Sequence, residues 1–271
     1  MKYLLCAVLS TWFAFGQTSN SAPAAAGQPI SVDQENARKA KTLVDQMIQA
    51  LGGNAYLNVE DISQEGRTYG FHLGQSEGVG VLFWRFYKFP DKDRIELTKK
   101  RDVAYVYRGD QGFEITYKGT RSDEPKTVTD YLRRREYSLD WVIRKWLPEP
   151  GTALFYEGHT VAAQKDAEQV TIMTSSNQSV TLYLDSSSHL PVKKTYSWRD
   201  PSDKQRNIED EIYDNYRPVQ GIMTPFSVTR FYNGDMSNQR FFNSVSYNKG
   251  LADSMFAADI TYDPYKAAPK K

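Results

Sequence analysis

A cluster of carboxylates beside a tyrosine-rich stretch is the part of the sequence best suited to chemistry. Glu209, Asp210, Glu211 and Asp214 lie next to the stretch YDNYRPVQGIMTPFSVTRFYNGD. A pair of acids about 5–10 Å apart is what glycoside hydrolysis requires. Strand alternation sends Glu209 and Glu211 to one face and Asp210 to the other. The sequence therefore favours a solvated strand face beside a turn over a pair of catalytic acids.

The remaining residues with chemical potential are too scattered to form a recognisable motif. The three histidines, His72, His159 and His189, show no short ligand spacing, and zinc sites depend on such spacing. The chain has no G-x-S-x-G nucleophile elbow and no P-loop, and Gly78-Val79-Gly80 lacks the strand-before, helix-after context of a dinucleotide loop. We therefore expect no catalytic residue, no metal and no cofactor, and a protein that is not an enzyme.

The first residues predict export. Residues 1–16, MKYLLCAVLSTWFAFG, combine a lysine, an apolar run and a small-residue cleavage site, which is typical of a secretory signal peptide; a second cleavage site lies near residue 24. An uncleaved anchor is the alternative. Residues 17–30 are expected to form a flexible leader. The only cysteine, Cys6, lies inside the signal, so the mature chain has no thiol and no disulfide.

The charge balance is near neutral. A formal charge of +1 over 271 residues gives no sign of nucleic-acid binding. The one basic run, Arg133-Arg134-Arg135, is interpreted as a solvated helix face, and the alternative is a site for an acidic partner or a lipid headgroup.

Two helices are predicted. After Ser31, a plausible N-cap, apolar residues recur at helical spacing until Gly52-Gly53 ends the pattern. That stripe consists of Ala40, Leu43, Val44, Met47, Ile48 and Leu51. A second helix is predicted over 138–147, capped by Ser138 and ended by Pro148. Its upstream part, 127–137, is charged and gives a weaker signal.

The rest of the chain follows the alternation of β-strands. Residues 79–89, VGVLFWRFYKF, are apolar on both faces, so both faces should be covered. Further strands are predicted at 57–72, 94–97, 103–108, 113–118, 153–161, 168–174, 179–185, 191–198, 206–215 and 239–248. Within the tyrosine-rich stretch, residues 218–221 and Asn233-Gly234 are predicted turns, Pro225 a strand start, and the polar groups the outer face of a sheet. The order favours an α+β domain built on a curved antiparallel sheet.

Several segments, in their order along the chain, resemble the periplasmic lipoprotein-carrier superfamily, the LolA-like and LolB-like half-open β-barrels. They are the signal peptide, the helix 31–51, LFWRFYKFPDKDRIEL, VAYVYRGDQGFEITY, LYLDSSSHLPVKKTYSW, the tyrosine-rich stretch and NKGLADSMF. The closest likeness is to outer-membrane lipoprotein-sorting-like proteins. The resemblance implies a single domain over 31–260 and a half-open β-barrel closed by the N-terminal and mid-chain helices. The polar composition of residues 261–271 predicts a loose tail.

In that family the barrel encloses an apolar cavity that holds acyl chains without catalysis. The resemblance implies cavity residues from one face of the early aromatic strand and from both helices; the other face of that strand is the alternative. The candidates are Leu82, Trp84, Phe86, Leu43, Met47, Val142, Ile143 and Trp146. The dedicated carrier has an arginine before the proline of that strand, whereas this chain has Phe89. The difference favours a paralogue with another apolar cargo, or a sensor built on the same fold.

The sequence thus predicts a periplasmic carrier or binding protein for the acyl chains of a lipid or lipoprotein, with an inner- or outer-membrane envelope protein as a further partner. The alternative is an envelope signalling or structural module that binds a protein through its sheet edge or its basic helix. An enzyme on the same fold is a third interpretation, because fold alone does not decide activity.

Overall fold

The structure is a computed structural model that describes residues 31–264. The predicted signal peptide and leader, residues 1–30, lie outside the described residues. From Val32 onward the chain forms one compact unit. Within residues 31–264, no helix combines the length and the apolar character that crossing a membrane requires.

Helix α1 (Val32–Leu51) confirms the predicted amphipathic helix. Its buried residues are Ala40, Leu43, Val44, Met47 and Leu51, five of the six in the predicted stripe. Gly52 and Gly53 end it with positive φ angles of 129° and 55°, which glycine adopts without the cost that a Cβ would add. A short helix, α2 (Asn54–Leu57), follows.

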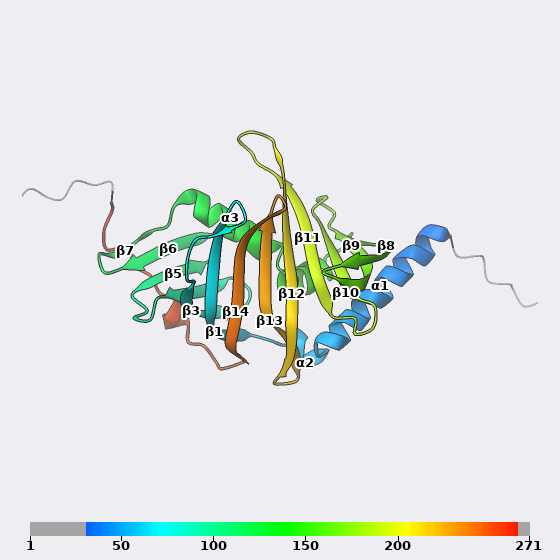
Figure 1. Cartoon of the computed structure of the whole chain (residues 1–271), viewed down its shortest axis with the longest axis horizontal. Coiled ribbons are helices and arrows are strands. Elements are labelled where there is room, and N and C mark those ends of the chain that lie inside the picture. Colours follow the sequence, from blue (N-terminus) through cyan, green and yellow to red (C-terminus); the bar gives the residue numbers. More distant parts are fainter. Residues whose placement is uncertain (1–30, 265–271) are drawn as a thin grey trace, which may run out of the picture. The chain divides into compact units, whose positions relative to one another are not determined.

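The strands form one antiparallel sheet. In chain order they are β1 (Asp61–His72), β2 (Gln75–Ser76), β3 (Val81–Lys88), β4 (Lys92–Leu97), β5 (Val103–Arg108), β6 (Gln111–Thr116), β7 (Gly119–Ser122), β8 (Ala153–Ala162), β9 (Lys165–Met173), β10 (Ser179–Asp185), β11 (Pro191–Arg199), β12 (Arg206–Val219), β13 (Ile222–Tyr232) and β14 (Asp235–Tyr247). The order across the sheet is β7-β6-β5-β4-β3-β1-β14-β13-β12-β11-β10-β9-β8, and β2 pairs with β1 outside this path (Figure 1). The described strands β7 and β8 end the order, so the sheet does not close. The predicted α+β half-open barrel is confirmed.

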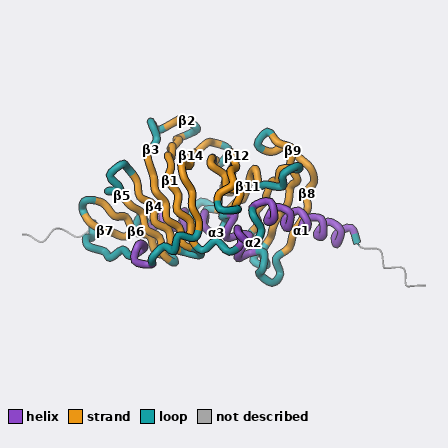
Figure 2. Tube along the Cα trace, turned by 90° about the horizontal axis from the view of Figure 1, so that it is seen from below, coloured by secondary structure: helices purple, strands orange, loops and turns teal. Residues whose placement is uncertain are grey.

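The mid-chain helices lie against one side of this sheet. Helix α3 (Pro125–Glu136) is followed by α4 (Leu139–Trp141) and by one π-helical turn, η1 (Val142–Trp146). The side chain of Ser138 caps α4 by accepting a hydrogen bond from the Trp141 N–H at 3.3 Å, as predicted. Figure 2 shows the strands curving around α2 and α3.

In the main hydrophobic core, apolar residues of the two predicted helices pack against the β8–β13 half of the sheet. Leu43 and Met47 of α1 and Val142, Ile143 and Trp146 of η1 belong to it, together with buried residues of β9 and β10. A smaller cluster covers the other face of β5 and β6, where Phe256 of the 3-10 helix η2 (Asp253–Phe256) packs against Val106 and Phe113.

The hairpin of β12 and β13 differs from its predicted boundaries. Strand β12 continues to Val219, so only Gln220 and Gly221 make the turn. Pro225 lies inside β13, opposite Tyr216 and beside the irregular residue Asn215, whose φ is 54°. The prediction that Pro225 starts a strand was therefore wrong, because β13 begins three residues earlier, at Ile222.

Candidate functional site

A cavity of about 540 Å³ lies between the sheet and the helices α2, α3 and α4. This volume is within the range of about 300–1,000 Å³ typical of small-molecule sites. Its apolar lining residues include Leu51, Val59, Ile62, Ile95, Leu139, Ile222, Met223, Val228 and Phe242. They come from α1, β1, β4, α4, β13 and β14 and the segment before β1, so segments far apart in the sequence build one cavity.

Tyrosines contribute much of the cavity wall. They are Tyr56, Tyr87, Tyr105, Tyr107, Tyr131, Tyr213, Tyr216 and Tyr247. Each hydroxyl has a hydrogen-bond partner: a carboxylate for Tyr56, Tyr105, Tyr107, Tyr131 and Tyr213, a backbone carbonyl for Tyr87 and Tyr216, and the Thr224 hydroxyl for Tyr247. With the hydroxyls engaged, the rings contribute apolar surface to the wall, although Tyr107 and Tyr131 stack on each other with ring centroids 3.6 Å apart.

These tyrosines stay neutral. Burial raises the pKa of all eight, and it raises the pKa of Tyr247 to about 12. A phenol with a raised pKa is neither a base nor a nucleophile at neutral pH. The tyrosine wall is therefore suited to binding, with hydroxyls that are hydrogen-bonded to the protein.

Two ion pairs stand at opposite ends of a charged band across the cavity face of the sheet. On β3, Arg85 pairs with Asp93 of β4: its Nε and Nη2 lie 3.0 Å and 2.9 Å from the Asp93 oxygens. On β13, the Nη2 of Arg230 lies 2.9 Å from an oxygen of Glu211, on the neighbouring strand β12. The Tyr131 hydroxyl of α3 donates to Asp93 at 3.1 Å, so the first pair is also fixed to a helix.

Glu211 is the centre of the second ion pair. It accepts hydrogen bonds from Arg230 and Tyr213 and pairs with Lys194, whose Nζ lies 2.9 Å away and whose side chain is 1% exposed. Burial alone would raise the pKa of Glu211, but Lys194 and Arg230 outweigh it and hold this pKa well below the usual value. Glu209, on the same strand, is 3% exposed. The predicted solvated carboxylate face was therefore wrong, because these acids neutralise buried cations.

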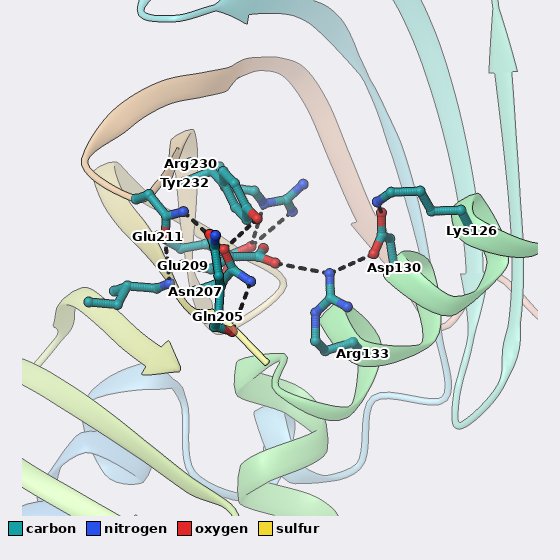
Figure 3. A network of polar contacts seen from close by, with 11 residues as sticks. Lys126, Asp130, Arg133, Gln205, Asn207, Glu209, Glu211, Arg230 and Tyr232 are labelled. Atoms are coloured by element: carbon teal, nitrogen blue, oxygen red, sulfur yellow. Dashed lines mark hydrogen bonds and ion pairs between the residues drawn. The ribbon is translucent and has the colours of Figure 1, made fainter. Parts of the chain in front are cut away.

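Helix α3 is fastened to the sheet by the basic run. The Nη2 of Arg133 lies 2.7 Å from Asp130 and 3.4 Å from Glu209 of β12 (Figure 3). Arg135 donates to the Gly109 carbonyl at 2.7 Å, and Arg134 lines the cavity. The interpretation of this run as a solvated face was wrong: its arginines are partly buried and point to the sheet or into the cavity.

None of the eight residues proposed from the sequence lines the cavity. Leu43, Met47, Val142, Ile143 and Trp146 fill the main core instead. On β3 the cavity residues are Arg85 and Tyr87, so alternation places Leu82, Trp84 and Phe86 on the other face. There Phe86 packs against the cluster around Phe256, and Trp84 lies under the guanidinium of Arg101.

The sequence reasoning also missed the polar members of the wall. Tyr213, Tyr216 and Arg230 come from the stretch whose polar groups were predicted to face outward, yet they line the cavity. One signal was available: Arg85 shares a strand face with Phe83 and Tyr87 in an otherwise apolar strand, and an arginine on a covered face requires a partner or a ligand.

Comparison with known proteins rests on structure alone, since neither a protein-family model nor a curated protein matches the chain. A DUF1329 family protein from Desulfovibrio piger superposes with a TM-score of 0.57 at 12% identity, over 80% of this chain and 97% of the other. A domain from Vibrio parahaemolyticus assigned to outer membrane lipoprotein sorting gives 0.53 at 10% identity, over 82% and 97%. A LolA superfamily protein from Nitrosomonas europaea gives 0.50 at 12% identity, over 80% and 97%.

These similarities define the class of the fold. The unclosed antiparallel sheet with an N-terminal and a mid-chain helix is a LolA-like fold, as the resemblance in the sequence predicted. At such identities the likeness concerns architecture, and the ligand must be argued from the cavity itself.

Proposed function

We propose that this protein is a non-enzymatic carrier or binding protein that holds an acyl chain of a lipid or lipidated protein in the cavity between its sheet and its helices. The observation that carries the proposal is the cavity wall, which contains aliphatic side chains and tyrosine rings whose hydroxyls are already bonded, beside a charged band. Each methylene group that leaves water for such a wall contributes about 0.8 kcal/mol, so a long chain can be retained without a specific contact.

The apolar end of the cavity adjoins the main core. Leu51, Val59 and Ile222 line it there, and Tyr56 and Tyr247 add their rings. Strand register brings Ile62 opposite Tyr247, so these residues share one end of the sheet. An acyl chain would lie along this end, beneath α2.

Movement of helix α3 would give a ligand access to the cavity. Helix α3 lies over the cavity and is held by side-chain contacts of Tyr131 and Arg133 with two different parts of the sheet. Release of those contacts would uncover the cavity, which is what loading and unloading of a cargo require. The predicted signal peptide supports an exchange in the periplasm, and the cargo class agrees with the lipoprotein-sorting assignment of the Vibrio parahaemolyticus domain.

The test is a titration of the purified full chain with a fluorescent fatty acid, with a variant that fills the cavity. Val228→Trp adds bulk to a residue of the wall, so we expect binding to weaken at least about tenfold, as filling a site does. Val161→Trp makes the same change at a residue that is 69% exposed on β8 and should leave binding unchanged. Equal binding by both variants, or no binding by the parent chain, contradicts the proposal.

A further inference from the structure

One cation in the cavity wall has no counter-ion. Arg240 of β14 lines the cavity, and among residues 31–264 its guanidinium forms no ion pair and no hydrogen bond. The ring centroid of Phe83 lies 6.0 Å from the guanidinium carbon. Removing a charge from water costs free energy unless an opposite charge pairs with it. The position of Arg240 therefore favours the binding of a negatively charged group.

We propose that Arg240, assisted by Arg134, binds the anionic headgroup of the ligand, a carboxylate or a phosphate, and that the cavity therefore selects acidic amphiphiles. The inference rests on the proposed function, because it assigns the polar end of the same ligand.

The strand register explains why the anion would bind at this place. Arg240 lies opposite Val228, two residues from Arg230 on β13, so the two arginines share a face as diagonal neighbours about 7–8 Å apart. Arg230 pairs with Glu211, which it shares with Lys194, and Arg85 pairs with Asp93. The band thus has a carboxylate at each end and an unpaired guanidinium between them. An oxyanion bound at Arg240 would supply the negative charge that this guanidinium lacks.

Helix α3 supplies the second unpaired cation. Arg134 also lines the cavity, and within the described residues its guanidinium has no ion pair or hydrogen bond. It belongs to α3, on the opposite side of the cavity from Arg85, Arg230 and Arg240 of the sheet. Two guanidinium groups that approach from a helix and a sheet can clamp one carboxylate or phosphate.

The electrostatics of both arginines agree with an anion-binding site. Burial lowers the pKa of Arg240, and the neighbouring Arg230 and Arg85 lower it further, to about 9. Burial and Arg230 likewise lower the pKa of Arg134. Both groups remain cations at neutral pH, and a bound anion would relieve the repulsion that acts on them.

The distance between the charged and apolar ends matches a long-chain amphiphile. Arg240 and Tyr247 are seven residues apart on β14, which corresponds to about 20 Å along a strand. Both line the same cavity. A ligand with its headgroup at Arg240 would therefore lay its chain toward Leu51 and Ile222, where the wall is apolar.

The test compares three ligands of equal chain length with different headgroups: palmitic acid, hexadecyl phosphate and hexadecanol. We expect the full chain to bind at least one of the acids about tenfold to a hundredfold more tightly than the alcohol, the range for a charge-assisted hydrogen bond. Arg240→Met should abolish this preference without weakening the binding of hexadecanol. The control Arg206→Met removes an exposed arginine at the start of β12 and should keep the preference.

The outcomes separate the two proposals. If the alcohol and both acids bind equally well, or if Arg240→Met keeps the preference, the headgroup site is wrong while the carrier function stands. If none of the three chains binds, the carrier function fails and this inference fails with it. The last measurement is the affinity of the chain for inorganic phosphate. If inorganic phosphate binds as tightly as hexadecyl phosphate, the site binds a free anion and the headgroup assignment is wrong.

Discussion

Asn36 of α1 forms two hydrogen bonds with the backbone of Tyr156 in β8. Its Nδ2 donates to the Tyr156 carbonyl oxygen at 2.7 Å, and its Oδ1 accepts from the Tyr156 N–H at 2.8 Å. Strand β8 ends the sheet order, so its outer backbone groups would otherwise be open to another strand. The amide of Asn36 thus takes the place of a neighbouring strand and anchors the helix at the same time.

Replacing Asn36 with Ala should lower the free energy of unfolding by about 1–3 kcal/mol, because two backbone-directed hydrogen bonds are lost. The measurement is chemical denaturation followed by circular dichroism. Thr42→Ala is the control, since Thr42 is an exposed residue of the same helix whose hydroxyl donates only within the helix. Equal stabilities for the two variants would show that Asn36 does not hold the edge strand.

Glu211→Gln should be strongly destabilising, by about 3–5 kcal/mol, because it leaves Lys194 and Arg230 buried without their shared carboxylate. Asp214→Asn makes the same chemical change at an exposed position on the same strand and should alter stability by less than about 0.5 kcal/mol. Thermal unfolding of both variants decides the matter; a Glu211→Gln variant as stable as Asp214→Asn would refute the assigned role.

The ion pairs of Glu211 also predict how stability depends on pH. Its folded-state pKa lies well below its ordinary value of 4.5, so its contribution is complete above pH 4.5 and disappears as pH falls through the folded-state pKa. We expect the stability difference between the parent chain and Glu211→Gln to shrink steadily below pH 4.5. Denaturation midpoints at a series of acidic pH values measure it, and a difference that is constant with pH would contradict the account.

Local patterns predicted the scaffold but not the cavity. The stripe of α1, the hairpins and the helix after Ser138 follow from period and capping, which the sequence displays directly. The lining residues of the cavity cannot be predicted from period and capping. Alternation assigns Arg85 and Tyr87 to one face of β3, but it does not tell whether that face contacts water, the core or the cavity. That depends on the curvature of the sheet and on α3, whose Tyr131 reaches Asp93 across 38 residues of chain. The same ambiguity turned Glu209 and Glu211 into predicted surface acids.

Two arginines of the same cavity should respond to substitution in opposite ways. Arg240→Met removes a partly buried cation that has no ion-pair partner among the described residues, so the free energy of unfolding should rise by about 1–3 kcal/mol, as when buried charges give way to apolar groups. Arg85→Met leaves Asp93 buried without its cation and should lower that energy by about 3–5 kcal/mol. Thermal unfolding without ligand measures both. If Arg240→Met is as damaging as Arg85→Met, then Arg240 is a structural residue.

Native mass spectrometry of the purified full chain tests the central claim most directly. The account predicts one amphiphile per chain, either carried through purification or taken up when palmitic acid is added, and displaced in Val228→Trp but retained in Val161→Trp. A chain that shows only its own mass, before and after palmitic acid is added, would contradict the assignment of the cavity as a ligand site.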